Sequence, residues 1–298
     1  MAVISFDQPF ARSMVGEPDG RIQARYRPGI GQYHPAKAAI MHEPAGRGLG
    51  DFLRSRRERL TPETVDLPER RRRRTPGLRR EEVAELAGIG IDWYVRLEQG
   101  RAGSPSATTI DALAEALRLD ATDRDHLRTL ARRPPRETFV RETVPDGTRR
   151  LVESLGTPAY VTGRRWDVLA WNTAAAELLT DFGRLDPGDR NILVYLLLMP
   201  EARRLFGDGW AAQAAHTTAQ FRAAHDLWAP DPAFTGLADR LRRGCPEFAA
   251  WWERHDVLPA GAGRKTLHHP SEGTLVFEYA TFQANEDPAL RLTVYSPA

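Results

Sequence analysis

The stretch Arg80–Gln99 limits what this chain can fold into more than any other part of the sequence. Its apolar residues stand where two helices that cross at a steep angle touch each other: Val83, Ala87, Ile89, Tyr94 and Leu97. Ala84 falls where the second helix crosses most closely, so a larger side chain would push the helices apart. Gly88 falls in the turn, where a positive φ penalises any Cβ. The pattern therefore predicts two helices joined by a tight turn.

Two structures are compatible with this pattern. One is a helix-turn-helix, whose second helix enters the major groove of DNA; the other is an ordinary pair of antiparallel helices in a helical core. Seven positions match the helix-turn-helix, and helical periodicity continues on both sides of it. We therefore interpret the stretch as a DNA-binding unit.

Five short helices are predicted in a domain that spans residues 46–133. The first helix is expected over Leu49 to Leu60, and the others over Arg79–Ala87, Gly90–Gln99, Ser106–Leu117 and Thr122–Ala131. Thr122 and Asp125 have the spacing of a capping box for the last helix. Pro134 ends that helix because proline cannot continue the hydrogen-bond ladder. Five helices in about 85 residues form one compact domain.

The pattern changes after a linker predicted at residues 134–150, and residues 151–298 form a second domain. Its predicted elements are strands at Pro158–Gly163 and Trp166–Trp171, helices at Thr173–Leu179, Asn191–Met199, Gly209–Trp228, Pro232–Arg242 and Pro246–Arg254, and strands at Arg264–His269, Thr274–Gln283 and Arg291–Tyr295. Two strands, several helices and three more strands indicate an α+β domain with an antiparallel sheet. Ahead of both domains, residues 1–45 are predicted to be a disordered leader, with Met41 as an alternative translation start.

Composition excludes several classes of protein. The chain has 298 residues, enough for about two domains. Its longest strongly apolar run, Ile192–Met199, has 8 residues, whereas a membrane-spanning helix needs about 20. Cys245 is the only cysteine, which excludes an internal disulfide and a multi-cysteine zinc site. We therefore expect a reducing, cytoplasmic setting.

Basic charge is concentrated in the middle of the chain. Only Lys37 and Lys265 are lysines among the 42 basic residues, and such an arginine excess often reflects codon usage. The net charge is +1 for residues 1–45, +4 for residues 46–140 and −3 for residues 141–298. This distribution indicates an anionic partner for the helical domain.

The helical segment resembles the Xre-type, phage-repressor-like five-helix domain, through Leu97-Glu98-x-Gly100 and Pro105-Ser106 as well as the helix-turn-helix itself. The resemblance implies DNA contacts by Arg79, Arg80, Gly90, Ile91, Asp92, Trp93, Val95 and Arg96. Arg79 stands where the family usually has a Ser or Thr cap, and Arg80 where it often has a glutamine. Ile91 and Trp93 suit apolar contact with thymine methyl groups, but Trp93 equally suits a place in the helix core.

Arginines also gather just ahead of the helix-turn-helix. Arg70 to Arg74, with Arg79 and Arg80, place seven arginines in eleven residues. As a flexible arm, Arg72, Arg73 and Arg74 would neutralise DNA phosphates. The alternative is a solvated loop shaped by codon usage.

The chain after residue 46 resembles the MmyB-like regulators. The resemblance rests on Arg72–Val83, Tyr94-x-Arg96-Leu97-Glu98-Gln99-Gly100, Pro158–Asn172, Asn191, Pro200–Arg203 and Trp252-x-x-His255-Asp256-Val257. It implies a bacterial transcription regulator whose second domain has a PAS-like fold and binds a fatty-acid-like ligand. The expected fold class is thus a five-helix Xre-type domain followed by a PAS-like, antiparallel five-stranded sheet packed with helices.

A ligand of this kind needs an apolar slot and a hydrogen-bond donor for its carboxylate. The candidates for the slot are Tyr160, Leu169, Trp171, Phe221, Trp228, Trp252 and Phe277. The candidate donors are Arg165, Asn172 and His255. The plainer alternatives are a core of bulky side chains, a helix cap at Asn172 and a helix-end histidine at His255.

Catalysis finds little support in the sequence. His216 and His225 lie on opposite sides of one predicted helix, so they cannot bind one metal ion. His225-Asp226 and His255-Asp256 are typical of metal-dependent phosphohydrolases, but a His-Asp pair alone is a weak signal. We therefore predict no enzymatic activity, no metal and no cofactor; a haem or flavin sensor is the main alternative. The expected partners are an apolar ligand and double-stranded DNA, which a homodimer binds at an inverted repeat.

Overall fold

The computed structural model describes residues 47–67, 77–132, 138–228, 231–259, 261–285 and 287–298. The predicted leader, the alternative start at Met41 and the predicted arm of Arg72, Arg73 and Arg74 lie outside these residues. None of the described helices is long and apolar enough to cross a membrane.

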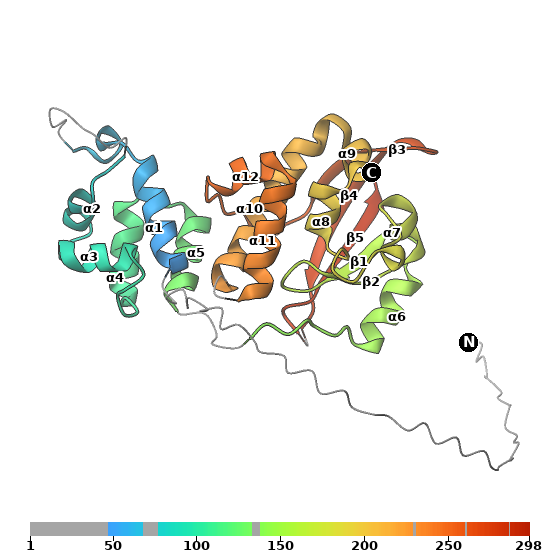
Figure 1. Cartoon of the computed structure of the whole chain (residues 1–298), viewed down its shortest axis with the longest axis horizontal. Helices are drawn as coiled ribbons and strands as arrows, with labels where there is room; N and C mark the ends of the chain where they lie inside the picture. Colours follow the sequence, from blue (N-terminus) through green and yellow to red (C-terminus); the bar gives the residue numbers. More distant parts are fainter. Residues whose placement is uncertain (1–46, 68–76, 133–137, 229–230, 260, 286) are drawn as a thin grey trace, which may run out of the picture. The chain divides into compact units, whose positions relative to one another are not determined.

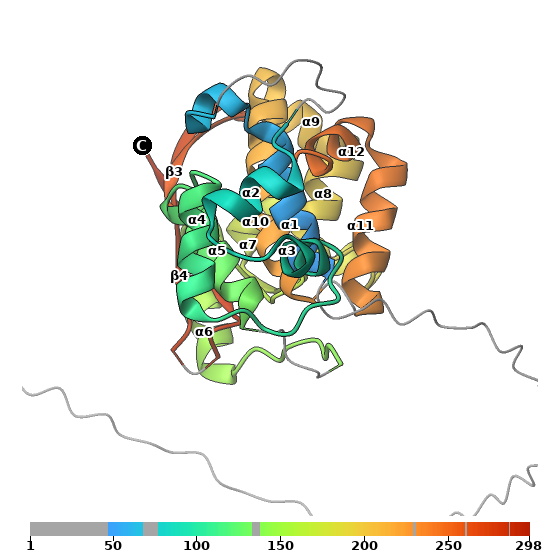
Figure 2. The ribbon, with the colours of Figure 1, turned by 90° about the vertical axis from the view of Figure 1, so that its left-hand side faces the viewer.

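The first part of the chain is helical, as predicted, and Figure 2 shows α1 to α5 gathered into one bundle. The elements are α1 (Arg47–Arg59), the 3-10 turn η1 (Pro62–Val65), α2 (Arg80–Leu86), α3 (Ile91–Glu98), α4 (Ala107–Ala116) and α5 (Ala121–Ala131). The apolar positions of the predicted helix-turn-helix pack together: Val83, Ala84, Ala87, Tyr94 and Leu97 are all buried in one core. The five-helix domain is therefore built around the pattern from which it was predicted.

The turns and caps of this bundle follow local chemistry. Gly88 between α2 and α3 has φ 63°, the left-handed conformation for which glycine was expected. Ser106 caps α4 by accepting a hydrogen bond from the backbone N–H of Thr109 at 3.2 Å. The predicted cap of α5 was wrong by two residues, because the Asp120 side chain accepts from the backbone N–H of Asp123 at 2.8 Å. Asp120 is an equally good capping residue, and the sequence pattern did not rank it above Thr122.

The second part of the chain is the predicted α+β domain. Its elements are α6 (Asp146–Ser154), β1 (Ala159–Thr162), β2 (Val168–Trp171), α7 (Thr173–Leu178), η2 (Phe182–Arg184), α8 (Ile192–Leu198), α9 (Pro200–Phe206), η3 (Gly207–Gly209), α10 (Trp210–Trp228), α11 (Pro232–Gly244), α12 (Pro246–Trp252), β3 (Gly263–His269), β4 (Gly273–Gln283) and β5 (Arg291–Pro297). Two of its helices were not predicted: α6, which begins inside the predicted linker, and the short α9.

The five strands form one sheet in the order β2-β1-β5-β4-β3, and every neighbouring pair is antiparallel. The sheet brings the first and last strands of the domain together, since Tyr160 of β1 pairs with Thr293 of β5. On the other side of β5, Tyr295 pairs with Tyr279 of β4. This confirms the PAS-like antiparallel five-stranded sheet packed with helices.

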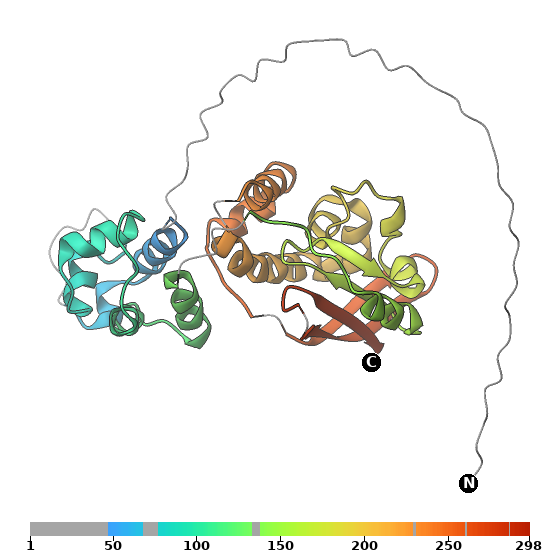
Figure 3. The ribbon, with the colours of Figure 1, turned by 90° about the horizontal axis from the view of Figure 1, so that it is seen from below.

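The helices between β2 and β3 cover one face of this sheet, and Figures 1 and 3 show them in yellow to orange. Side chains of α8 to α12 share one buried core with Tyr160, Leu267, Phe277 and Tyr295 of the strands. The opposite face of β1 and β2 packs against α6 through Val152. The inner face, which carries most of the aromatic residues, is where the domain has room for a cavity.

Candidate functional sites

The first site is the outer face of α3. Gly90, Ile91, Asp92 and Arg96 are exposed, with 41% of the Ile91 surface open to solvent. On the other side of the same helix Tyr94, Leu97 and Glu98 are buried. An exposed isoleucine beside an exposed arginine leaves one face of this helix open for a partner.

A buried ion-pair network holds α3 in place. Glu98 is 3% exposed, and its carboxylate accepts hydrogen bonds from Arg57 Nε at 2.9 Å and Arg57 Nη2 at 2.7 Å. Arg57 Nη1 donates to the Leu78 carbonyl oxygen at 2.9 Å, and Arg80 Nε donates to the second oxygen of Glu98. Burial by itself lowers the pKa of Arg57, but the hydrogen bond and the charge of Glu98 raise it overall. The network thus fixes α1, α2 and α3 to one another.

The backbones of α1 and α3 also approach closely at this point. A Cβ on Gly50 would collide with the Glu98 carbonyl oxygen, so only glycine fits there. The close approach buries the inner side of α3 and leaves its outer side exposed.

Some of the residues predicted to contact DNA lie on the exposed face of α3, and others belong to the buried ion-pair network and core behind it. Trp93 and Val95 are half-buried, and Trp93 packs against the helical core. The Arg80 side chain is paired with Glu98. The Arg79 backbone N–H donates to the Glu82 carboxylate at 2.7 Å, and its side chain lies 3.7 Å from Glu81. Arg79 therefore holds the cap position of α2 through its backbone, without the Ser or Thr side chain usual in the family.

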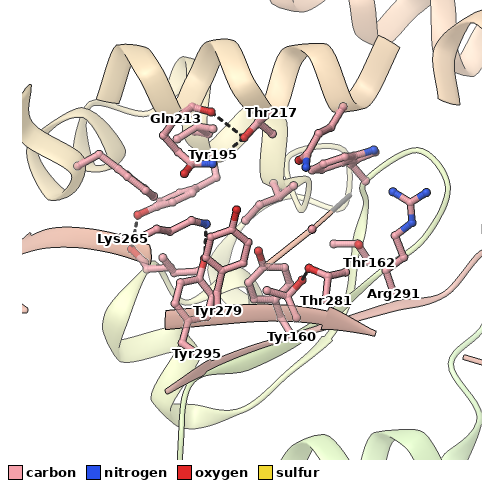
Figure 4. Close-up of a pocket in the computed structure, with 18 residues that line it drawn as sticks. Tyr160, Thr162, Tyr195, Gln213, Thr217, Lys265, Tyr279, Thr281, Arg291 and Tyr295 are labelled. Atoms are coloured by element: carbon pink, nitrogen blue, oxygen red, sulfur yellow. Dashed lines mark hydrogen bonds between the residues drawn. The ribbon is translucent and has the colours of Figure 1, made fainter. Parts of the chain in front are cut away.

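The second site is a cavity of about 60 Å³ between the inner face of the sheet and helices α8, α9 and α10. Figure 4 shows side chains from both layers pointing into it. The lining residues are Tyr160, Thr162, Trp166, Leu179, Ile192, Tyr195, Leu196, Phe206, Gln213, Thr217, Gln220, Gly261, Lys265, Tyr279, Thr281, Arg291, Thr293 and Tyr295. The strands contribute mainly Tyr and Thr, whereas α8 and α9 contribute Ile192, Leu196 and Phe206 beside Tyr195. The cavity therefore has a hydroxyl-rich floor and a roof that is mainly apolar where α8 and α9 form it and polar where α10 contributes Gln213, Thr217 and Gln220.

Lys265 of β3 lies in a cage of tyrosines at one end of this cavity (Figure 4). Its Nζ donates to Tyr295 Oη at 2.9 Å, and it lies 4.1 Å from the ring centre of Tyr279 and 5.0 Å from that of Tyr295. Burial lowers the pKa of Lys265 below its usual range. The same burial raises the pKa of Tyr160 and Tyr295, so both phenols stay neutral.

Hydrogen bonds within the cavity wall hold several polar groups in place. Thr217 Oγ1 donates to the Gln213 carbonyl oxygen at 2.8 Å, and Gln213 Nε2 donates back to Thr217 Oγ1 at 2.9 Å. The hydroxyls of Thr281 and Thr293 lie 3.2 Å apart on neighbouring strands. The walls are thus partly pre-ordered, which lowers the cost of binding a ligand.

Of the ligand-binding residues predicted from the sequence, only Tyr160 is among the lining residues. Phe221, Trp252 and Phe277 lie in the core of the domain, and Trp171 and Trp228 pack against that core. Leu169 packs against the opposite face of the sheet. The side chains of these residues fill space between helices and sheet, which is the plainer alternative for bulky residues.

The three predicted donors have other partners or lie elsewhere. Asn172 caps α7 through the Ala175 backbone N–H at 2.9 Å and donates to the Thr157 carbonyl oxygen at 2.7 Å. Arg165 forms a bidentate pair with Asp167 at 2.8 and 2.9 Å. His255 is outside the cavity lining and has φ 51°. Asn172 thus has the capping role that was its alternative.

Lys265 and Arg291, which line the cavity, were not among the ligand-binding residues predicted from the sequence. The signal was present: Tyr279 and Thr281 alternate on β4, and Arg291, Thr293 and Tyr295 alternate on β5. Residues two apart on a strand share a face, and polar residues in that pattern are as typical of a solvent-exposed face as of a cavity. Only the helices packed over the sheet decide between the two.

A third cluster connects the helical domain to α10. The Asp226 carboxylate is buried and lies 3.2 Å from His126 Nε2 of α5, 3.4 Å from Arg222 Nη1 and 3.3 Å from His225 Nδ1. Although burial opposes ionisation, the charge of Arg222 and the two histidines hold the pKa of Asp226 well below its usual range. The His225-Asp226 pair thus has an arginine and a second histidine as partners. Within the described residues no group of three His, Cys, Asp or Glu is placed to hold a metal ion.

The comparisons agree with the two-domain arrangement. A family model described as a helix-turn-helix domain matches residues 49–127. A second, described as the ligand-binding domain of MmyB-like transcription regulators, matches residues 144–298. A search of curated proteins finds no match to the chain. The exposed helix α3 lies inside the first match, and the cavity lies inside the second.

Proposed function

The chain belongs to the MmyB-like transcription regulators, DNA-binding proteins controlled by a ligand, and we propose how its two domains carry out these two tasks. Residues 46–133 are the DNA-binding domain, and residues 151–298 bind the ligand, with the segment between them as a linker that ends in α6. The matched families are regulator domains rather than enzymes.

DNA is bound through the outer face of α3. Arg96 donates to a guanine or a phosphate, and Ile91 contacts a thymine methyl group, from the first turns of a helix that lies in the major groove. Arg79 contributes a phosphate contact beside it, and Arg80 supports the site through Glu98. The observation that carries this proposal is the exposure of Ile91, Asp92 and Arg96 above a rigid, buried frame.

Two copies of the chain bind one operator. Recognition helices reach adjacent major grooves on one side of the duplex only when they are one helical turn apart, about 34 Å. A homodimer on an inverted repeat satisfies this spacing. A change of half-site spacing by five base pairs turns one half-site to the opposite side of the duplex and should abolish cooperative binding.

The ligand is an acid with an apolar body, the class to which fatty acids belong. The cavity supports this proposal with apolar side chains on α8 and α9 for the body and the ammonium group of Lys265 for the acid. Buried charge-assisted hydrogen bonds are strong and specific. The same cavity is lined by side chains of α10, which gives the ligand a direct way to influence that helix.

Helix α10 connects the ligand to the DNA-binding domain. Gln213, Thr217 and Gln220 in its first half line the cavity. In its second half Asp226 contacts His126 of α5, and Leu227 packs against the helical core. A ligand that binds one position of α10 better than another shifts the population of domain arrangements, and thereby the affinity for DNA.

The proposal is tested by selecting DNA sequences with the full chain and measuring affinity by fluorescence anisotropy. Ile91→Asp places a negative charge on the exposed face of α3 and should weaken binding to the selected sequence at least tenfold. Val140→Asp is the matched control, because Val140 is 77% exposed and far from α3 in sequence; it should leave affinity unchanged. Equal affinities of the wild type and Ile91→Asp would contradict the proposal.

A further inference from the structure

The ligand cavity has a basic side chain at each end. Lys265 Nζ contacts Tyr295 at one end, and Arg291 lines the other (Figure 4). Tyr295 and Arg291 are four residues apart on β5, and their Cα atoms are thus separated by about 13 Å along the strand. Both residues face the cavity because positions 291, 293 and 295 share one side of the strand.

Neither cation has an acidic partner in the structure as described. No Asp or Glu is among the residues that line the cavity. Within the described ranges, Lys265 has one hydrogen bond, to a phenol, and no ion pair to Arg291 is found. Burial lowers the pKa of both groups. A cation taken out of water without a counterion is costly, and a bound anion removes that cost.

The walls between the two cations differ from each other in chemistry. The floor carries the hydroxyls of Tyr160, Thr162 and Thr281, and the roof carries Ile192 and Leu196. A chain of methylene groups fits against the roof. Nothing in the lining would repel a negative charge at either end.

The size of the cavity favours a short ligand. A volume of about 60 Å³ corresponds to about four to six water molecules, or roughly 120–180 Å³ of liquid. A fatty acid with sixteen carbons exceeds this volume and would have to widen the cavity.

We propose that the ligand is a short organic diacid, with one acid group held by Lys265 and the other by Arg291. This inference rests on the proposed function and narrows its ligand class. An aliphatic diacid places one acid group beside each of these side chains, with its methylene groups against the apolar part of the cavity wall.

The second acid group also gives the ligand a route to the DNA-binding domain. Arg291 lines a second, larger cavity of about 380 Å³, which is lined as well by Thr122, His126 and Thr129 of α5. A carboxylate that draws Arg291 towards the first cavity removes its positive charge from the second. A diacid should therefore change DNA affinity more than a monoacid that leaves Arg291 in place.

The test uses the full chain and four probes in isothermal titration calorimetry: octanedioate, octanoate, dimethyl octanedioate and hexadecanoate. Octanedioate should bind about ten- to a hundredfold more tightly than octanoate, since it adds one charge-assisted hydrogen-bonded contact. The uncharged diester should bind no more tightly than octanoate.

Two substitutions test which residue causes the preference for octanedioate over octanoate. Arg291→Gln should remove the preference for octanedioate and leave octanoate affinity unchanged, whereas Lys265→Met should weaken both acids. Arg264→Gln is the matched control, because Arg264 is exposed on the neighbouring position of β3; it should keep the wild-type preference. Circular dichroism and thermal melting verify that each variant is folded.

Each adverse outcome has one meaning. Equal affinity for octanoate and octanedioate, or a preference that survives Arg291→Gln, overturns the diacid inference. If hexadecanoate binds and changes DNA affinity while octanedioate does not bind, the inference fails and the proposed function stands. If none of the acids binds, the inference fails together with the proposed acidic ligand, and DNA binding by α3 is decided by the Ile91→Asp experiment alone.

Discussion

Basic side chains behind α3 and in the cavity of the sheet domain lie partly or wholly out of water, and within the described ranges only those behind α3 have carboxylate partners. In the helical domain Arg57 and Arg80 share the buried Glu98. In the cavity of the sheet domain Lys265 has tyrosines around it and no acidic residue in the lining. Removing one partner of a buried ion pair destabilises the fold, because it leaves an uncompensated charge. A cation in a cavity without a carboxylate partner gains a counterion only when an anionic ligand binds.

Among the described residues, Arg96 is a third kind of basic side chain, neither paired with a carboxylate nor enclosed in a cavity. It is exposed on α3 and forms no ion pair within the described part of the chain. Water solvates such a group at little cost, so it weighs neither for nor against folding. The three settings predict three different outcomes when the charge is removed: loss of stability, loss of DNA affinity, and loss of ligand affinity.

The largest effect is expected for Glu98→Gln. Loss of this carboxylate leaves Arg57, which is 6% exposed, with only the exposed carboxylate of Glu58 at 3.2 Å as a counterion among the described residues, and the free energy of unfolding should fall by about 3 kcal/mol, the lower end for a broken buried pair. Urea unfolding measures it. Glu81→Gln, at an exposed position of the neighbouring helix, should change stability by less than about 0.5 kcal/mol. A loss below about 1 kcal/mol for Glu98→Gln would mean that the network is not needed for stability.

Arg96→Ala should separate DNA affinity from folding. We expect it to cost about 1–3 kcal/mol of binding to the selected DNA sequence if Arg96 contacts a base, with unfolding unchanged within about 0.5 kcal/mol. Arg184→Ala removes a surface arginine whose side chain is 87% exposed and serves as the control for net charge. Equal losses of affinity in the two variants would assign the effect to overall charge rather than to α3.

The pH dependence of stability tests how the buried Arg222, which is paired with Asp226, affects the titration of His255. Burial and the charge of Arg222 lower the pKa of His255 to about 4, although Asp226 and Glu253 oppose the shift. The folded chain thus keeps this ring neutral where the unfolded chain protonates it. Stability conferred by the neutral ring is complete above pH 6.5 and falls as the pH decreases towards 4. Because solvent reaches part of the ring, we expect a loss of about 1–2 kcal/mol over this window.

The variant His255→Asn measures this contribution, because asparagine tolerates the left-handed backbone at this position better than most residues. Denaturant unfolding between pH 7 and pH 4 should show a smaller decrease of stability for the variant than for the wild type. The titration of Asp226 belongs to a lower window, because its pKa lies below its usual range. Identical pH profiles would show that His255 does not titrate differently on folding.

A small effect on stability, opposite in kind to that of Glu98→Gln, is expected for Lys265→Met. Methionine fills similar space without a charge that needs a counterion, so the free energy of unfolding should stay within about 1 kcal/mol of the wild type or rise. Chemical unfolding without ligand measures it. A loss above about 2 kcal/mol would show that Lys265 stabilises the fold, as Arg57 does, and would remove the contrast between the two regions.

The sequence predicted the helix-turn-helix and the α+β order because both depend on local regularities. Gly88 marks its turn by backbone chemistry, and Asn172 and Ser106 mark helix starts by their capping side chains. The resemblance to the MmyB-like regulators added the PAS-like sheet. The two helices that were not predicted, α6 and α9, are short and begin at or next to a proline. Each contains too few residues to show a clear helical period.

The residues predicted for the ligand site differ from the residues that line the cavity. Seven bulky residues were expected to form an apolar slot, yet only Tyr160 lines the cavity. Aromatic side chains are as common in cores as in binding sites, and Phe221 and Trp252 have no sequence feature that separates the two uses. Lys265 was not singled out either, because alternating polar residues on the neighbouring strands are as typical of a solvent-exposed face as of a cavity.

The sequence by itself determined where helices begin, where the chain turns and which face of α3 is polar, since these depend on residues within one or two turns of each other. The tertiary structure decided which cations have carboxylate partners. Arg57 meets Glu98 across 41 residues, and Lys265 meets Tyr295 across 30. Such distances in sequence carry no periodic signal, and the electrostatic environment of a buried charge exists only once the elements around it have packed.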